Sequence, residues 1–132
     1  DGHLILKGVM EADVAARAEG FGVDAIWVSN HAGRQFDGAP ASLDALRMVR
    51  GATTLPLIFD SGIEGGLDIL RALALGAHFV MMGRPWHYAL GALGRAGPAH
   101  LHDMLAKDMV SNMAQMGVTR FAELPDRLAT PG

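Results

Sequence analysis

The sequence contains no cysteine, which excludes disulfides, thiolate-bound zinc and a thiol nucleophile. It also lacks an excess of basic residues, because 11 Lys and Arg stand against 14 Asp and Glu, giving a net charge of -3. Nucleic-acid binding depends on concentrated positive charge, so no nucleic-acid partner is expected. No apolar run is long enough to cross a bilayer, and the first residues do not resemble a signal peptide. We therefore expect a cytoplasmic protein without a transmembrane segment.

The composition that remains is that of an ordinary globular protein, with 50% hydrophobic and 19% charged residues. A chain of 132 residues is long enough for one domain with a hydrophobic core. It begins at Asp1 rather than at a methionine, and an apolar segment follows almost at once. We expect one domain, residues 1–132, that is a piece of a longer protein.

Short apolar segments alternate with segments of helical periodicity. The predicted strands are residues 3–7, 24–29, 56–60 and 78–82. The predicted helices are residues 11–22, 42–53, 66–77 and 98–117, with Ser42 as an N-cap. The strands are apolar throughout rather than at alternate positions, which is typical of parallel strands covered on both faces. The pattern therefore predicts an α/β fold built from βα units, with the four strands parallel and adjacent in chain order and the intervening helices on one side.

Polar residues follow the end of each predicted strand: Lys7, the stretch 29–34, Asp60 and Arg84. Because the carboxyl ends of parallel strands share one edge, we expect these residues to line a common rim. The glycine-rich stretch 60–66 leads into a helix whose first N–H groups favour an anion, and Arg84 adds a guanidinium suited to phosphate oxygens. Glycines at these positions also suit tight turns between a strand and a helix.

Four motifs carry a resemblance to a known family. In chain order they are LKGV, VSNHAGRQFDGAPAS, DSGI followed by DILRALALGA, and MMGRP. In this order they resemble the FMN-dependent α-hydroxy acid dehydrogenases and oxidases, which include glycolate oxidase, flavin-type L-lactate dehydrogenase and mandelate dehydrogenase. The resemblance implies a TIM (β/α)8 barrel, of which this chain is the C-terminal half with strands five to eight. It also implies FMN as cofactor and a small 2-hydroxy acid, such as L-lactate, as the substrate that is oxidised to a 2-oxo acid.

The resemblance also implies roles for individual residues. His31 would be the catalytic base that takes a proton from the substrate, and Arg34 would bind the substrate carboxylate. Lys7 would stabilise negative charge on the reduced flavin. The residues that would contact FMN are Lys7, Ser29, Asp60, Ser61, Gly62, Glu64, Gly83 and Arg84.

Two places in the sequence depart from the family pattern. Ala32 stands where glycine is frequent, so the loop between His31 and Arg34 is expected to differ in geometry. Glu64 and Gly65 stand where many members have a basic residue that helps to hold the FMN phosphate. Since a carboxylate repels phosphate, we expect either that Glu64 points to solvent or that Arg84 and the backbone hold the phosphate.

The other candidates for chemistry are interpreted as structural. No metal site is expected, because the remaining histidines lack metal-ligand spacing. They are His3, His78, His87, His100 and His102, and we interpret them as structural or surface residues. Trp27 and Trp86 are expected to lie in the core.

Two further function classes remain open. One is an inactive half-barrel that binds FMN or another phosphate ligand, and the other is a purely structural fragment. In either case the unpaired strand edges would require a homo-oligomer or association with the missing N-terminal half. In an active parent protein, a membrane-bound electron acceptor would add a location at the membrane periphery.

Overall fold

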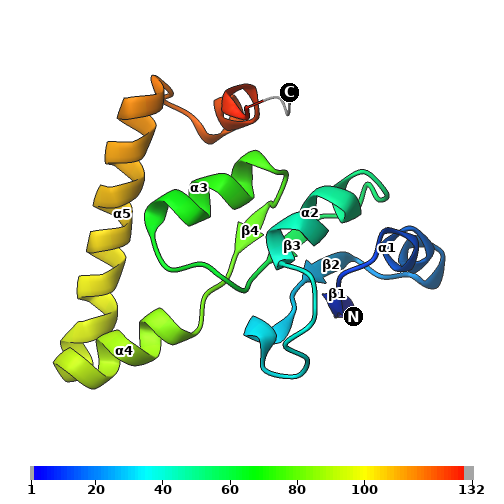
Figure 1. Ribbon diagram of the computed structural model, residues 1–132, viewed down its shortest axis with the longest axis horizontal. Helices are drawn as coiled ribbons and strands as arrows, with labels where there is room; N and C mark the ends of the chain where they lie inside the picture. The colour runs from blue at the N-terminus through cyan, green and yellow to red at the C-terminus, as the bar shows by residue number, and fades with distance from the viewer. Residues whose placement is uncertain (1, 130–132) are drawn as a thin grey trace.

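A parallel sheet with the strand order β1-β2-β3-β4 organises residues 2–129, which the computed structural model describes (Figure 1). The strands are β1 (Ile5–Val9), β2 (Ala25–Val28), β3 (Leu57–Phe59) and β4 (Phe79–Val80). All three neighbouring pairs are parallel. The prediction of four adjacent parallel strands in chain order is therefore confirmed, although β1 begins and ends two residues later than expected.

Helices follow each strand, as the periodicity predicts. They are α1 (Ala12–Ala18), α2 (Ser42–Arg50), α3 (Gly66–Ala74), α4 (Arg84–Leu93) and α5 (Gly97–Met116). Shorter 3₁₀ segments are η1 (Glu19–Phe21), η2 (His31–Gly33), η3 (Gly94–Ala96) and η4 (Phe121–Arg127). The first predicted helix is shorter than expected, because it tightens into η1 and ends at Gly22, whose φ of 74° is left-handed.

Ser42 does not cap α2, contrary to the expectation from the sequence. The N-cap residue is Ala41, and no side chain caps this end. The Ser42 hydroxyl instead donates a 2.9 Å hydrogen bond to the carbonyl oxygen of Ser61, in the loop that follows β3. It ties the start of α2 to that loop rather than to its own helix.

The sheet is well covered on one face only. Ile26, Val28, Leu57 and Phe59 are each at most 1% exposed and pack in one core with residues of α1 and α2. The opposite face carries Trp27 and Ile58, which are only partly buried. At the edges of the sheet Ile5 is 44% exposed and Phe79 is 59% exposed. The expectation of strands buried on both faces is therefore wrong for the described residues. The expectation of intervening helices on one side is confirmed, because the right-handed crossovers bring α1 and α2 back to the same side.

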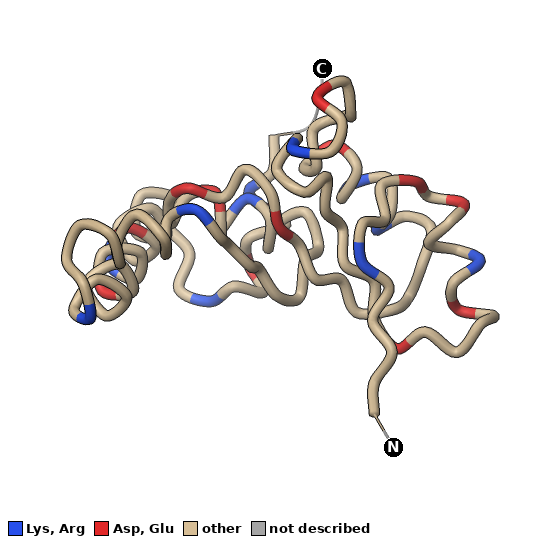
Figure 2. Tube along the Cα trace, turned by 90° about the horizontal axis from the view of Figure 1, so that it is seen from below, with Lys and Arg blue, Asp and Glu red and all other residues tan. Residues whose placement is uncertain are grey.

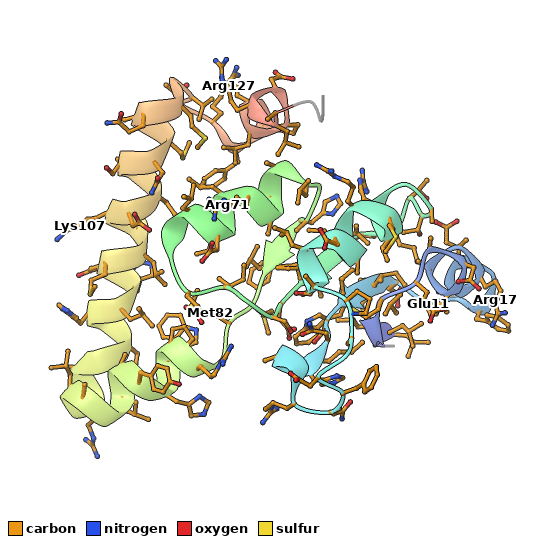
Figure 3. All side chains as sticks on the ribbon, viewed as in Figure 1. Glu11, Arg17, Arg71, Met82, Lys107 and Arg127 are labelled. Atoms are coloured by element: carbon orange, nitrogen blue, oxygen red, sulfur yellow. The ribbon has the colours of Figure 1, made fainter. Side chains whose placement is uncertain are left out.

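A second, smaller core joins the end of the chain to α3. Leu70 of α3 packs with Val118 and Leu124, against a row of methionines on α5 that includes Met109 and Met113. Figure 3 shows Lys107 on the outer side of α5, directed away from this core. Basic and acidic residues are interspersed along the described chain (Figure 2). Among residues 2–129, no helix combines the length and the apolar character that a membrane span requires.

Candidate functional site

The residues predicted to share a rim meet around one cavity of about 300 Å³ at the carboxyl ends of the strands. Its lining includes Lys7, His31, Arg34, Asp60, Ser61, Gly62, Gly83 and Arg84. All of these except Lys7, which lies within β1, follow the end of a strand, and all line the same cavity, so the prediction of a common rim is confirmed. Ser29 joins the group through Lys7, whose Nζ donates to the Ser29 hydroxyl at 3.1 Å. Among the predicted residues, Glu64 lies outside this lining.

Lys7 is positioned by an irregularity in β1. The pairing with β2 shifts between Lys7 and Val9, so Gly8 is the extra residue of a β-bulge. Gly8 has a φ of +87°, which a side chain at this position would oppose. The Lys7 ammonium lies 4.4 Å from the centroid of the Trp27 ring, within the range of a cation–π contact. The bulge thus sets Lys7 at the edge of the cavity, above a half-buried indole.

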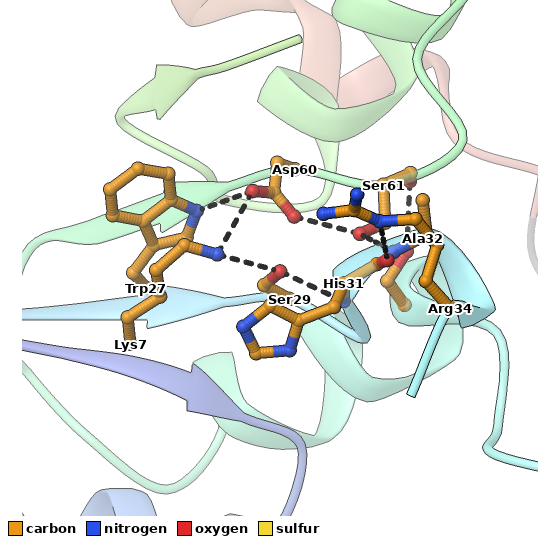
Figure 4. A network of polar contacts seen from close by, with 9 residues as sticks. Lys7, Trp27, Ser29, His31, Ala32, Arg34, Asp60 and Ser61 are labelled. Carbon is orange, nitrogen blue, oxygen red and sulfur yellow. Dashed lines mark hydrogen bonds and ion pairs between the residues drawn. The ribbon is translucent and has the colours of Figure 1, made fainter. Parts of the chain in front are cut away.

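Asp60 is the centre of the polar network in Figure 4. Its Oδ2 accepts hydrogen bonds from Lys7 Nζ at 3.3 Å and from Trp27 Nε1 at 3.1 Å. Its Oδ1 accepts a 2.7 Å hydrogen bond from the Ser61 hydroxyl. Burial acts to raise the pKa of Asp60, but hydrogen bonds from Ser29 and Ser61 and the charge of Lys7 outweigh it and hold the pKa below its ordinary value. Asp60 is therefore ionised at neutral pH and keeps Lys7 in place.

His31 sits in a turn that is left-handed throughout. His31, Ala32 and Gly33 have φ values of 54°, 58° and 72°. Only glycine adopts this conformation without cost, and an L-residue there costs about 1–2 kcal/mol. Ala32 therefore adopts a glycine-like conformation at a position where a glycine would be relaxed. The departure at Ala32 therefore places an alanine under strain in this turn.

Side chains from both neighbouring loops hold this turn. The His31 N–H donates to the Ser29 hydroxyl at 3.1 Å, and the Ala32 N–H donates to the Ser61 hydroxyl at 3.0 Å. Arg34 Nε donates to the His31 carbonyl oxygen at 3.4 Å. Only Nε takes part in this bond, so the two terminal nitrogens of the guanidinium are not used by it. The turn therefore presents an imidazole and a guanidinium to the same cavity in a fixed relation.

Gly8 also lies directly against the His31 ring. A Cβ atom at Gly8 would lie 3.4 Å from His31 Cε1, in addition to the strain at a φ of +87°. We expect Gly8→Ala to destabilise the fold by about 1–2 kcal/mol. Urea unfolding followed by circular dichroism measures this change.

Gly22→Ala is the matched control, because Gly22 also has a positive φ, of +74°, but has open space around its Cβ position. The two variants share the backbone strain, so any larger loss in Gly8→Ala reports the contact with His31. Equal stability of Gly8→Ala and the unmodified chain would contradict the strained bulge.

The N-terminus of α3 is not open to an anion, contrary to the expectation from the sequence. The N–H groups of Glu64 and Gly65 both donate to Asp68 Oδ2 at 3.2 Å. The Gly66 N–H donates to Asp108 Oδ2, on α5, at 2.6 Å. Carboxylates of the chain itself therefore occupy the position predicted for an external anion.

The N-terminus of α4, in contrast, is open at the cavity. Its N-cap is Gly83, Pro85 lies in its first turn, and no side chain among the described residues caps it. A Cβ atom at Gly62 or Gly83 would meet nothing within 4 Å, so the cavity wall there is bare backbone. Bare backbone, an uncapped helix start and the Arg84 guanidinium together suit a phosphate group.

Glu64 lies beside the N-terminus of α4. Its carboxylate is 4.0 Å from Arg84 Nη2, and the two side chains are 75% and 56% exposed. An exposed pair at this distance contributes at most about 1 kcal/mol. Glu64 thus points to solvent, as one of the two expectations held, and it partly neutralises Arg84.

Three cavity features were not foreseen from the sequence. Trp27, expected in the core, lies beside the cavity as the indole under Lys7 and the donor to Asp60. His87, interpreted as structural or surface, lines the cavity, and its Nδ1 lies 3.0 Å from the Gly83 carbonyl oxygen. Met82 also lines the cavity, on the segment between β4 and α4 (Figure 3). Met82 was the last residue of the predicted strand 78–82, and its place at the strand end is a signal that was not used.

Comparison with known proteins decides the family. The model of the FMN-dependent dehydrogenase family matches residues 1–130. The chain belongs to this family. The L-lactate dehydrogenase of Chromohalobacter salexigens is 42% identical over 133 residues, which cover 98% of this chain and 34% of the relative. An L-lactate oxidase of Nostoc sp. is 44% identical over 123 residues, covering 92% of this chain and 34% of the relative.

The fold of this FMN-dependent dehydrogenase chain agrees with that of a solved member. A soluble mutant of the membrane-associated (S)-mandelate dehydrogenase from Pseudomonas putida superimposes with a TM-score of 0.93 at 36% identity, covering 99% of this chain and 38% of that chain. The four parallel strands therefore match part of a TIM barrel. The chain spans about a third of the length of the curated relatives it matches, which is less than the half expected.

Proposed function

We propose that this chain is the part of an FMN-dependent enzyme that carries the base and the substrate clamp for oxidation of an L-lactate-like 2-hydroxy acid. The observation that carries the proposal is the convergence of Lys7, His31, Arg34, Asp60 and Arg84 on one cavity. The named activities of the relatives, L-lactate dehydrogenase and L-lactate oxidase, support the substrate class. The residues of the cavity have the chemistry that this reaction requires.

The donor set fits FMN at both ends. At one end Arg84, the backbone of Gly62 and Gly83 and the start of α4 would hold the phosphate. At the other end the ammonium of Lys7 would meet the electron-rich edge of the flavin. Asp60 accepts hydrogen bonds from Lys7, Trp27 and Ser61, and a ribityl hydroxyl would be a further donor to its carboxylate. Ser29 and Ser61 lie between these ends, and Glu64 lies at the phosphate end.

The chain's own residues then position the substrate and move its proton. Arg34 would bind the substrate carboxylate through its terminal nitrogens, since its Nε is bonded to the His31 carbonyl. His31 would take the hydroxyl proton on a ring nitrogen, a task suited to an imidazole near neutral pH. FMN, when bound, would accept the hydride equivalent from the substrate carbon that carries this hydroxyl. Lys7, which Asp60 holds in place through their ion pair, would stabilise the negative charge that develops.

The open face of the sheet supports a partner that completes the barrel. Ile5, Leu6, Phe79 and Met81 are apolar and between 37% and 59% exposed, and they lie at both edges of the sheet. Edge strands of this kind pair with further strands or become covered. We propose association with the missing N-terminal part, or with further copies of the chain, in a cytoplasmic protein that meets a membrane only peripherally.

A graft tests the proposed function. The matched segment of the Chromohalobacter salexigens L-lactate dehydrogenase is replaced by this chain, so that the relative supplies the rest of the barrel. The graft is expected to bind FMN and to bleach its absorbance when L-lactate is added. A graft that folds and holds FMN but is not reduced by L-lactate, glycolate or mandelate would contradict the proposal.

Glu64 should weaken phosphate binding. Replacing it by Gln removes a charge 4.0 Å from Arg84, and Glu64→Arg adds a cation at the same place. A charge of this exposure is worth about 1 kcal/mol, so Glu64→Gln should lower the Kd for FMN about fivefold in the graft. Glu64→Arg, which changes the charge by two units, should lower the Kd for FMN further than Glu64→Gln does. Quenching of flavin fluorescence on binding measures both.

Riboflavin is the matched control ligand, because it lacks the phosphate. Its Kd should stay unchanged in both Glu64 variants. If riboflavin and FMN gained equally, Glu64 would act on the fold of the loop rather than on the phosphate.

A further inference from the structure

Backbone strain in this chain concentrates at one hydrogen bond. Among residues 2–129 the non-glycine residues with positive φ are His31, Ala32 and Ser61, at 54°, 58° and 82°. The Ala32 N–H donates to the Ser61 hydroxyl at 3.0 Å, and so joins the two strained loops, which lie 29 residues apart in sequence. Strain of this kind persists only where surrounding contacts hold it. The contacts of Ser61 therefore show what holds the turn of His31.

The direction of each bond at Ser61 follows from counting protons. A serine hydroxyl has one proton and two acceptor lone pairs. Ser61 donates its proton to Asp60 Oδ1, at 2.7 Å, because an ionised carboxylate only accepts. The oxygen is then left as an acceptor, which is what the Ala32 N–H requires. Asp60 thus determines that the Ser61 hydroxyl presents a lone pair to the turn.

Ser61 is itself held by a second serine. Its carbonyl oxygen accepts a 2.9 Å hydrogen bond from Ser42 Oγ, at the start of α2. The hydroxyl oxygen and the carbonyl oxygen of Ser61 therefore both accept hydrogen bonds within the chain. Figure 4 shows Ser61 between Asp60 and Ala32, with Arg34 close by.

We infer that Ser61 is a positioning residue that connects the carboxylate of Asp60 to the left-handed turn carrying His31. The inference deepens the proposed function and rests on it. It explains how Asp60, proposed to contact FMN, and His31, proposed to take the substrate proton, are held together. Ser61 was expected from the sequence to contact FMN, and the inference gives its hydroxyl a role within the chain instead. The ionised carboxylate of Asp60 thereby helps to fix the orientation of His31.

Hydrogen exchange at residue 32 tests the inference without FMN or substrate. Ser61→Gly removes the hydroxyl, and glycine accepts a φ of 82° more readily than serine, so no backbone strain is added. We expect the Ala32 amide, followed by NMR in the 132-residue chain, to exchange about tenfold faster than in the unmodified chain. Ser61→Ala, which keeps the Cβ, should give the same acceleration.

Two controls separate this effect from a general loss of stability. The Ile26 amide donates to the Pro56 carbonyl oxygen in the sheet, at 3.0 Å, and its exchange should not change. Ser42→Ala removes the neighbouring hydroxyl, which bonds to Ser61 and not to the turn, and it should leave the Ala32 amide protected. Unchanged exchange at residue 32 in both Ser61 variants would overturn the inference, and so would equal acceleration at Ile26.

Asp60→Asn tests the connection to the carboxylate. Lys7 and Trp27 both donate to Oδ2, so the amide of this variant would turn its oxygen toward them and its NH₂ toward Ser61. The Ser61 oxygen would then accept from that NH₂ group, and its bond to the Ala32 N–H would weaken, so that the Ala32 amide exchanges several fold faster. Because both changes act through one bond, Asp60→Asn should add nothing in the Ser61→Gly background.

The ring signals of His31 give a readout that a purely structural role would not move. In Ser61→Gly they should shift toward those of a free histidine, while the signals of His78 stay in place. Additive exchange rates in the double variant, or an unmoved His31 ring, would show that Asp60 acts on the turn by another route. These exchange and ring measurements use no ligand, so a negative result in them would not contradict the proposed function. Failure of the graft to bind FMN would likewise not contradict the role of Ser61.

Discussion

Replacing His31 by Ala in the graft is expected to slow reduction of FMN by L-lactate by a factor on the order of 10²–10⁴. The imidazole lies over Gly8 and lines the same cavity as Arg34, so it is placed to take the substrate hydroxyl proton. Alanine cannot accept that proton, and water would have to do so without orientation. Stopped-flow absorbance of the flavin measures the rate of reduction.

The control for this prediction is a histidine outside the cavity. His102→Ala on α5 removes a side chain that is 74% exposed, and the rate of reduction should not change. Binding of FMN should also be nearly equal in His31→Ala and the unmodified graft, because His31 is not among the proposed phosphate or ribityl contacts. A His31→Ala graft that reduces FMN at the unmodified rate would remove His31 from the mechanism.

The common rim could be predicted because strand ends are readable in a sequence. Each apolar run of a βα unit ends at the carboxyl edge of a parallel sheet, so Lys7, His31, Asp60 and Arg84 had to emerge together. The periodicity is a local property of the sequence, and the strand order follows from short right-handed connections between successive strands. That is why the predicted elements agree with the structure to within a few residues.

The partners at the rim could not be predicted, because they join loops that are distant in sequence. Asp108 lies 42 residues from Gly66, and it closes the helix end that the sequence offered to a phosphate. The indole of Trp27 lies 33 residues from Asp60 and yet donates to it. A tryptophan within an apolar strand carries no local sign of which face it occupies.

Backbone strain was equally hidden. A positive φ is signalled in a sequence by glycine, as at Gly8 and Gly62, but His31, Ala32 and Ser61 carry no such signal. Their conformation depends on hydroxyls supplied by other loops. The strain therefore became visible only once the loops were assembled.

The coverage of the sheet was misjudged for a different reason. Apolar residues on both faces of a strand are typical of sheets with two covering layers, while the described residues supply one. Ile5 and Phe79 have the composition of buried positions and the exposure of a surface. The same mismatch leads to the second large effect that we expect.

The 132-residue chain on its own is expected to show no turnover of L-lactate above the rate of free FMN, although the graft turns over. Catalysis requires the base, the clamp and the cofactor to be held within about 0.5 Å of the productive geometry, in a site from which water is excluded. In the chain alone, Lys7 remains 37% exposed and the second face of the sheet is uncovered. FMN would therefore lack the walls that fix it against His31.

Flavin absorbance during incubation with FMN and L-lactate measures this directly, with the graft as the positive control at equal concentration. If the N-terminal part of the relative is added as a separate chain, it should cover Ile5 and Phe79, and partial turnover should return as the two parts associate. Rescue should depend on the concentration of the added part and should be absent with a His31→Ala chain. Bleaching by the chain alone at an enzyme-like rate would mean that the open face is not needed for the chemistry, and that the residues of this cavity hold FMN unaided.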